Sequence, residues 1–396
     1  MDIIKNLNKY YVFQYDIRSA DQFYREMIVR VYKLSRLMGI NFTDREFSVF
    51  NAVFLLAVVF HGMYVYVFST SMYYYQDDVK KVLLNVTTVG FSIQMMAKLY
   101  LFVYNRLKVI SLCELNNKYF EEHHSRSKAV KDALFKNAKL TYVLLQLAAM
   151  FPSVVMFLVV TFSILYTLIT SNKLLPFGFE WMHSDTWTAY NVNILFQIVL
   201  LVYVVLATVG SDAIFILFLL VGSGQVDAIT AMLQDLNAMI ENDITEEQVT
   251  EQLREIIKLH QHLTLYMAKM EDSFKEYFLI TLAALSFCMI VSLCAVLVIG
   301  WVMGIAVILF ASSQLFYVCC LGTFWQIKCD ELLIEVWTLK WYKLSLRNEK
   351  AFLMMLSASQ VPLNLTAIFT SLDMSAYLNI HKTLYSICMI LIQSTK

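Results

Sequence analysis

The sequence has little of what soluble proteins use most. Charged residues make up 16% of its 396 residues, against about 25% in a typical soluble domain. Only 10 glycines and 3 prolines are present, so little of the chain is rich in turns. Hydrophobic residues account for 59%, and the mean hydropathy is +0.60. This composition excludes a soluble globular protein and indicates a helical membrane protein that crosses the bilayer several times.

The motifs of common enzyme chemistry are also missing. There is no glycine-rich phosphate loop, no pattern typical of an activated nucleophile and no metal-ligand spacing. His260 and His262 lie two residues apart, which on a helix directs their imidazoles to different sides. His123 and His124 lie in a charged segment, where a solvated surface is expected. We therefore predict a protein that is not an enzyme, with no cofactor, no metal site and no nucleic-acid partner.

Seven apolar runs are long enough to cross a bilayer as helices. They cover residues 48–70, 82–104, 140–169, 193–221, 277–300, 303–322 and 371–393. Long segments at 105–139, 222–276 and 323–370 lie on one side of the membrane. Short links, such as 71–81, lie on the other. The fold class is therefore predicted to be an all-α membrane protein with seven transmembrane helices.

Lysine and arginine are concentrated on one side of these helices. The segments 1–47 and 105–139 carry eight each, and 222–276 and 323–370 carry four and five. The opposite side carries only Lys80, Lys81, Lys173 and the terminal Lys396. Cytoplasmic loops are enriched in these residues. We therefore predict a cytoplasmic N-terminus and an extracellular C-terminus, which is the inverse of a G-protein-coupled receptor.

The pattern divides the chain into four parts. These are a cytoplasmic N-terminal arm (1–47), transmembrane helices one to six with cytoplasmic helical extensions at 105–139 and 222–276 (48–322), a cytoplasmic anchor segment (323–370) and the seventh helix (371–396).

Two cytoplasmic segments show helical patterns. Thr245 and Gln248 have the spacing of a capping box. An apolar stripe follows at Val249, Leu253, Ile256, Ile257, His260 and Leu263. A second apolar helix is predicted before Asn348 from Leu332, Leu333, Trp337 and Trp341. Both helices are expected either to pack within the chain or to contact a neighbouring subunit.

Two charged residues lie inside apolar runs. Asp212 is in the fourth run, and Lys98 is toward the cytoplasmic end of the second. Charge within the membrane marks functional positions by default. Each residue also has a simpler interpretation, because Lys98 can extend to the interface and Asp212 can lie at the cytoplasmic rim.

The last apolar run has a polar stripe. At 100° per residue, Asn379, Thr383 and Ser386 fall on one face of a helix. Ile390 continues this face toward the far end. Either the helix packs in a bundle with its hydroxyls bonded to its own carbonyls, or it lines a water-filled pore with Ile390 as a hydrophobic collar. Met389, 100° away, is the second candidate for the constriction.

Aromatic and sulfur-containing side chains gather in the outer halves of helices two, three, four and six. We predict that they line an apolar cavity in which a small volatile molecule binds by shape and burial. The candidate lining residues are Phe91, Met95, Phe157, Phe162, Tyr166, Tyr190, Phe196, Tyr203 and Phe310.

A series of short motifs runs through the last 150 residues. They are His260-x-x-Leu263, Met270-Glu271, Phe274, Trp337, Trp341-Tyr342, Ser359-Gln360-x-Pro362-Leu363, Leu365-Thr366-Ala367, Phe369, Ser371-Leu372-Asp373 and Lys382-Thr383-x-Tyr385-Ser386. In their order and spacing these motifs resemble the insect odorant receptor family.

The resemblance implies a subunit of a ligand-gated, non-selective cation channel in the plasma membrane of a sensory neuron. Four subunits would surround one pore, and each would contribute its last helix. A cytoplasmic anchor that includes Trp337, Trp341 and Tyr342 would join them. The resemblance also implies a heterotetramer with a shared co-receptor, and segment 222–276 lacks the long insertion of that co-receptor. The chain is therefore expected to be the odour-tuned subunit.

Three alternatives stay open at this point. Gustatory receptors of the same superfamily end in Thr-Tyr, five apolar residues and Gln-Phe. Here Ser386-Ile387, an apolar run and Gln393-Ser394 keep that spacing but match one of its four identities. A G-protein-coupled receptor is disfavoured by the inverted charge pattern. A transporter is disfavoured because neither an internal repeat nor a pair of broken helices is visible.

Overall fold

The computed structural model describes residues 27–31, 33, 52–122, 128–242 and 244–394. Most of these residues are helical, and the described part of the chain holds no β-strand beyond one isolated bridge between Thr366 and Ser371. Most of the predicted N-terminal arm, 1–47, and the pair His123 and His124 lie outside the described residues. The all-α fold class is confirmed.

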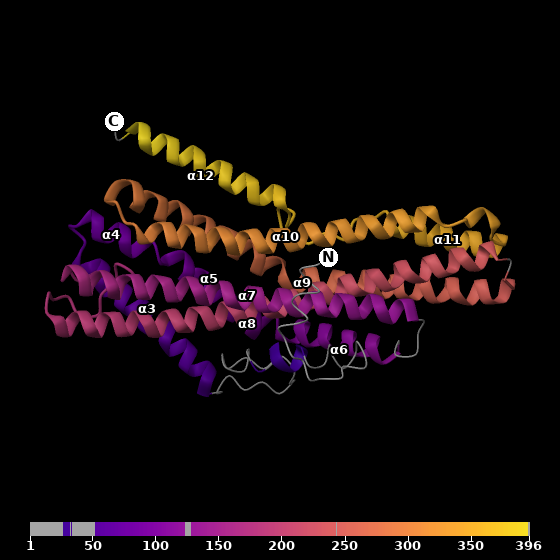
Figure 1. Ribbon diagram of the computed structural model, residues 1–396, viewed down its shortest axis with the longest axis horizontal. Coiled ribbons are helices and arrows are strands. Elements are labelled where there is room, and N and C mark those ends of the chain that lie inside the picture. Colours follow the sequence, from indigo (N-terminus) through magenta and orange to yellow (C-terminus); the bar gives the residue numbers. More distant parts are fainter. Residues whose placement is uncertain (1–26, 32, 34–51, 123–127, 243, 395–396) are drawn as a thin grey trace.

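The helices of the longer described segments follow one another with short links (Figure 1). They are α3 (Ala52–Tyr74), α4 (Val79–Val86), α5 (Val89–Tyr104), α6 (Arg106–Glu122), α7 (Lys128–Thr170), α8 (Trp187–Glu241), α9 (Glu246–Ile299), α10 (Met303–Thr338), the short 3₁₀ helix η1 (Trp341–Lys343), α11 (Leu346–Ser359) and α12 (Met374–Ser394).

Six helical stretches in the described residues are long and apolar enough to cross a membrane. They are Phe54–Tyr74, Val79–Leu101, Val130–Thr170, Trp187–Glu241, Glu246–Ile299 and Met303–Lys343. The second stretch joins α4 to α5 through Thr87 and Thr88, whose hydroxyls donate to the carbonyls of Leu84 and Asn85. The seventh predicted helix exists as α12 but is not among the six, because Asn379, His381 and Lys382 interrupt its apolar sequence near its start.

Several boundaries differ from those predicted. α3 continues to Tyr74, so the link predicted at 71–81 shortens to 75–78, and residues 48–51 are not described. Asp78 ends this link by accepting the backbone N–H groups of Lys80 and Lys81 at 3.0 and 3.3 Å. In the same way, the carboxylate of Asp373 accepts the N–H of Ala376, so α12 begins at Met374 rather than at residue 371.

The two longest helices extend far beyond any bilayer. α8 and α9 contain 55 and 54 residues, which corresponds to about 80 Å at 1.5 Å per residue. The hydrocarbon core is only about 30 Å thick. Their far ends form a hairpin at the right of Figure 1, beside the end of α10 and α11. Within the segment 222–276, which was predicted to form a helical extension, α8 continues to Glu241 and α9 begins at Glu246.

The predicted stripe on α9 is buried, as expected for a packed helix. Leu253, Ile256 and Leu263 are fully enclosed. The hydrogen bonds predicted for the capping box were wrong. Thr245 is the N-cap of α9, but its hydroxyl donates to the side-chain oxygen of Gln248 at 2.8 Å and accepts no backbone N–H. On this exposed turn the two side chains bond each other instead.

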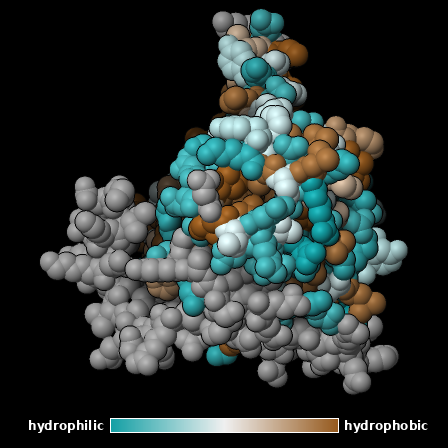
Figure 2. All heavy atoms as spheres, turned by 90° about the vertical axis from the view of Figure 1, so that its right-hand side faces the viewer, coloured by the Kyte–Doolittle hydropathy of each residue, from teal (hydrophilic) through white to brown (hydrophobic). Residues whose placement is uncertain are grey.

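The extent predicted for the second cytoplasmic helix was also wrong. Leu332, Leu333 and Trp337 belong to the end of α10. Leu339 is extended, and the N–H of Lys340 donates to Asn237 of α8 at 3.1 Å, which ends α10 before Trp341. Trp341 and Tyr342 lie in η1, and like Trp337 they are exposed. Figure 2 looks onto this end of the molecule, where hydrophilic side chains surround apolar ones.

The last helix stands away from the rest of the bundle. In Figure 1, α12 diverges from α10, and in Figure 2 it projects at the top. Its start is held close to α10, because a side chain at Gly322 would overlap the backbone of Leu372. The hydroxyl of Ser312 on α10 also bonds Tyr377 at 3.1 Å and His381 at 2.9 Å on α12. The outer part of α12 is left largely exposed.

Candidate functional site

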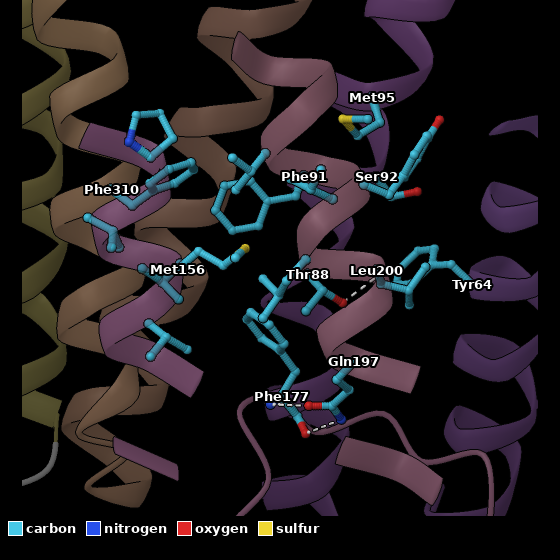
Figure 3. Close-up of a pocket in the computed structure, with 18 of the residues that line it drawn as sticks. Tyr64, Thr88, Phe91, Ser92, Met95, Met156, Phe177, Gln197, Leu200 and Phe310 are labelled. Carbon is cyan, nitrogen blue, oxygen red and sulfur yellow. Dashed lines mark hydrogen bonds between the residues drawn. The ribbon is translucent and has the colours of Figure 1, made fainter. Parts of the chain in front are cut away.

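A cavity of about 100 Å³ lies between α3, α5, α7, α8 and α10, under the link at 171–186 (Figure 3). Its wall consists of His61, Tyr64, Thr88, Phe91, Ser92, Met95, Pro152, Val155, Met156, Val159, Phe177, Phe179, Gln197, Leu200, Leu201, Tyr203, Val204, Val205, Ala306, Val307 and Phe310. Most of these side chains are apolar. An apolar cavity favours small hydrophobic ligands over charged ones.

The link at 171–186 closes the cavity because two amide side chains of α8 hold it. Gln197 accepts the N–H of Phe177 at 3.0 Å and donates to the carbonyls of Phe177 and Phe179 at 3.1 and 2.8 Å (Figure 3). One turn earlier, Asn193 accepts the N–H groups of Trp181 and Met182 at 2.7 and 3.0 Å. Backbone groups that would otherwise be unpaired are satisfied, and the link is fixed above the helices.

The sequence contained a signal for this arrangement that our reasoning missed. Asn193 and Gln197 are four residues apart in an otherwise apolar run, so both face the same side of α8. Buried amides normally have hydrogen-bond partners. The pair therefore marks a place where non-helical backbone meets the helix.

Four of the nine predicted lining residues meet in the cavity. Phe91 and Met95 come from α5, Tyr203 from α8 and Phe310 from α10. The rings of Phe91 and Phe310 approach edge to face, with centroids 5.6 Å apart. Contacts of this geometry are favourable between aromatic rings. These residues are 219 positions apart along the chain, and they join two helices across the cavity.

Three predicted residues of α7 lie outside the cavity. Phe157, Phe162 and Tyr166 are exposed on the outer surface of the helix. α7 instead contributes Val155 and Val159 to the cavity wall.

Two further predicted residues pack elsewhere. The hydroxyl of Tyr190 donates to Thr167 at 3.0 Å, which ties the start of α8 to the end of α7. Phe196 packs edge to face against Phe179 and Trp181 of the link. Both residues support the cover of the cavity and do not form its wall.

The first spanning helix, which the sequence analysis left out of the cavity, supplies part of its polar side. The hydroxyl of Tyr64 bonds that of Thr88 at 2.8 Å, and His61 bonds Ser92 at 3.3 Å. Two hydrogen bonds therefore link α3 to α5 and its N-cap along one wall of the cavity.

The charged residues within the membrane form a pair just beyond the cavity. Lys98 lies three residues after Met95 on α5, and its ammonium is 3.6 Å from the carboxylate of Asp212 on α8. Their side chains are only 2% and 6% exposed, so both charges are enclosed between helices and neither reaches the outer surface of the chain. Tyr277 of α9 donates to the same carboxylate at 3.0 Å.

The predicted pore-lining side chains share the exposed face of α12. Asn379, Thr383, Ser386 and Ile390 are all exposed, and so is Met389. The hydroxyls of Thr383 and Ser386 donate at 3.0 Å to the carbonyls four residues earlier in the helix. Both hydroxyls are thus hydrogen-bonded within their own helix. Within this chain, however, the polar face of α12 does not pack in a bundle.

Comparisons with known proteins agree with this architecture. A family model described as 7tm Odorant receptor matches residues 78–385. The structure of the insect olfactory receptor OR5 from Machilis hrabei superposes with a TM-score of 0.73 at 16% identity, over 93% of this chain and 98% of that one. The same receptor in complex with eugenol gives a TM-score of 0.72 at 17% identity, with the same coverage. At these identities the two structures establish a shared fold.

Proposed function

Because the chain belongs to the odorant receptor family, we propose that it is the odour-tuned subunit of a ligand-gated, non-selective cation channel in the plasma membrane of a sensory neuron. One observation carries the proposal. α10 contributes Phe310 to an apolar cavity, and two residues later Ser312 bonds α12, which presents an exposed polar face. A cavity for a ligand and a candidate pore helix are thus joined by one rigid element.

The ligand in this proposal is a small volatile molecule. The OR5 receptor from Machilis hrabei binds eugenol, and the cavity of this chain is apolar and has a volume of about 100 Å³. An apolar cavity of about 150 Å³ accommodates benzene. The cavity of this chain is smaller, so a ligand the size of one ring or a short chain enters when side chains of the wall move.

Gating follows if the open state binds the ligand better than the closed state. A ligand that separates Phe91 from Phe310 changes the position of α10 relative to α5. Through Ser312, this movement reaches Tyr377 and His381 at the inner part of α12. The outer part of α12 makes few contacts within the chain and can move with it.

The exposed face of α12 and the exposed aromatic residues of the extension support assembly with other subunits. Trp337, Trp341 and Tyr342 lie exposed near the far end of α10 and in η1. Exposed apolar side chains that gather in this way mark interaction surfaces. We assign them to contacts with a shared co-receptor in a heterotetramer around one pore. The family match favours this function over a gustatory channel or a G-protein-coupled receptor.

The proposed orientation places Lys396 outside the cell and Met1 in the cytoplasm. We expect a tag after Lys396 to stain on intact cells and a tag before Met1 to stain only after permeabilisation. The physical reason is the excess of lysine and arginine on the side of the long helical extension. The reverse staining pattern would contradict the orientation.

The cavity location predicts a specific loss of odorant sensitivity. In cells that also express the co-receptor, an active odorant should evoke a cation current. Phe310→Ala should raise the half-maximal concentration about ten- to a hundredfold, since losing a buried aromatic contact removes about 1–3 kcal/mol. Phe162→Ala is the matched control, because Phe162 lies on the outer face of α7. Dose–response curves should be compared at equal surface expression.

Two results would count against this proposal. One is the absence of any odorant-evoked current in the assembled complex across a broad panel. The other is an equal shift for Phe310→Ala and Phe162→Ala, which would place the ligand outside the cavity.

A further inference from the structure

Two glutamine side chains meet inside the apolar helix bundle, close to the cavity. Nε2 of Gln94 on α5 donates to Oε1 of Gln314 on α10 at 3.0 Å. Each residue is only 2% exposed, and neither belongs to the cavity wall. Glutamine is mostly found on protein surfaces. A buried glutamine pair that joins two helices therefore calls for a physical explanation.

The glutamine pair continues a contact that begins in the cavity. Gln94 lies three residues after Phe91 on α5, and Gln314 lies four residues after Phe310 on α10. Residues three or four apart lie on the same face of a helix. The rings of Phe91 and Phe310 meet with centroids 5.6 Å apart (Figure 3). The same faces of α5 and α10 are therefore joined twice, by an aromatic contact in the cavity and by a hydrogen bond one turn further along both helices.

Ligand entry acts on this hydrogen bond through the helices that carry it. The cavity has a volume of about 100 Å³, whereas an apolar cavity of about 150 Å³ accommodates benzene. A ligand the size of one ring therefore displaces wall residues such as Phe91 and Phe310. When this moves α10 away from α5, the enclosed glutamines have little room to follow. A bond of 3.0 Å is lost once its two atoms are about 3.6 Å apart, so a small displacement breaks it.

Breaking the pair leaves buried polar groups without partners. Nε2 of Gln314 already has no hydrogen-bond partner among the described residues, which shows that no second acceptor lies within its reach. Separation also removes the bond that satisfies Nε2 of Gln94 and Oε1 of Gln314. Unpaired amide groups are costly in an apolar interior. The glutamine pair therefore opposes any movement of α10 away from α5.

We propose that Gln94 and Gln314 are positioning residues that hold α10 against α5 and thereby set the odorant concentration at which the channel opens. They act through α10, because Ser312 of the same helix bonds Tyr377 and His381 of α12. Since the glutamines lie outside the cavity wall, they raise the concentration needed for every odorant alike. This inference rests on the proposed function and adds the residues that set its sensitivity.

The test replaces both glutamines by methionine, which has a similar length and shape but no amide. Gln94→Met combined with Gln314→Met should fold, because apolar replacement of both partners of a hydrogen bond is nearly neutral. Currents are recorded from the assembled complex in cells that express the co-receptor. The double variant should show a larger current without odorant. It should also lower the half-maximal concentrations of several odorants by one common factor, about three- to tenfold, as expected for one net hydrogen bond.

Gln146→Met is the matched control. Gln146 donates to Tyr142 at 2.7 Å, but both residues belong to α7, so this hydrogen bond joins no two helices. The control should leave the current without odorant and the half-maximal concentrations unchanged. Gln314→Asn breaks the pair in a second way, because its side chain is one methylene shorter and keeps the amide. It should shift the sensitivity in the same direction as the double variant.

Three results would overturn this inference. Unchanged or higher half-maximal concentrations in a double variant at the cell surface would show that the pair does not oppose opening. Shifts that differ among odorants would show that the glutamines act on the ligand itself. If neither the double variant nor Gln314→Asn reaches the surface, the pair serves folding and not sensitivity. In all three cases the unmodified receptor still responds to odorants, so the proposed function stands. That function fails only if the unmodified complex gives no odorant-evoked current.

Discussion

Replacing Asp212 by alanine is expected to leave little folded receptor at the cell surface. The substitution strands the ammonium of Lys98 inside the bundle, where it is 2% exposed and Asp212 is its ion-pair partner. Removing one member of a buried pair costs about 3–5 kcal/mol. That is a large share of the 5–15 kcal/mol that typically separates folded from unfolded protein.

The size of this effect can be measured with a double variant and a surface control. Lys98→Met combined with Asp212→Leu removes both charges and should restore much of the Tm and surface expression, because apolar replacements often match buried pairs. Asp272→Ala breaks an ion pair with Lys108 that is 2.7 Å long and about half exposed. Surface pairs contribute about 0–1 kcal/mol, so this control should behave almost as the unmodified receptor.

Two results would revise this interpretation. If Asp212→Ala and Asp272→Ala have the same small effect, the pair does not stabilise the fold. If the double variant is stable and reaches the surface but no longer conducts, the pair acts in gating. Its position supports either role, because Lys98 is one turn from Met95 of the cavity and Tyr277 connects the pair to α9.

Ile390→Ser is expected to give a standing current without odorant, or a marked increase in sensitivity. Ile390 is 65% exposed on the face of α12 that also presents Asn379, Thr383 and Ser386. If four such helices surround a pore, the isoleucines form a ring that closes it by excluding water. A serine hydroxyl makes this constriction easier to wet, so the closed state should begin to conduct.

The same helix offers a matched control. Ile392→Ser is the identical substitution two residues later, about 200° around the helix, and it should leave the closed state intact. Met389→Ser should have an intermediate effect, because Met389 lies beside the proposed pore face. Cysteines at positions 379, 383, 386 and 390 should be blocked by thiol reagents more than cysteines at 382 or 384. Uniform reactivity, or equal behaviour of the two isoleucine variants, would exclude this face as the gate.

Composition and periodicity were enough to predict the kind of molecule. The scarcity of charge, the long apolar runs and the stripe on α9 are properties of single segments. They can therefore be recognised in the sequence without knowledge of the tertiary structure. Polar residues within apolar runs were informative for the same reason. The polar stripe of α12 lies on a face that the chain itself leaves exposed.

The sequence could not determine which apolar residues line the cavity. Phe91 and Phe310 meet there, whereas Phe157 and Phe162 face outward. In a membrane protein, lipid and protein interior are equally apolar. A phenylalanine in a cavity, in the core or against lipid therefore has the same sequence pattern. Only the rotation of α7 relative to its neighbours distinguished these environments.

Pairing between distant segments was likewise decided by the tertiary structure. Lys98 and Asp212 each have a simple explanation when considered alone, and the correct one appears only when α5 lies against α8. The hydroxyl of Tyr203 is buried and has no hydrogen-bond partner among the described residues. A sequence shows which groups need a partner, since burial makes an unpaired charge or hydroxyl costly. The packing of helices far apart in the sequence determines which partner each group finds.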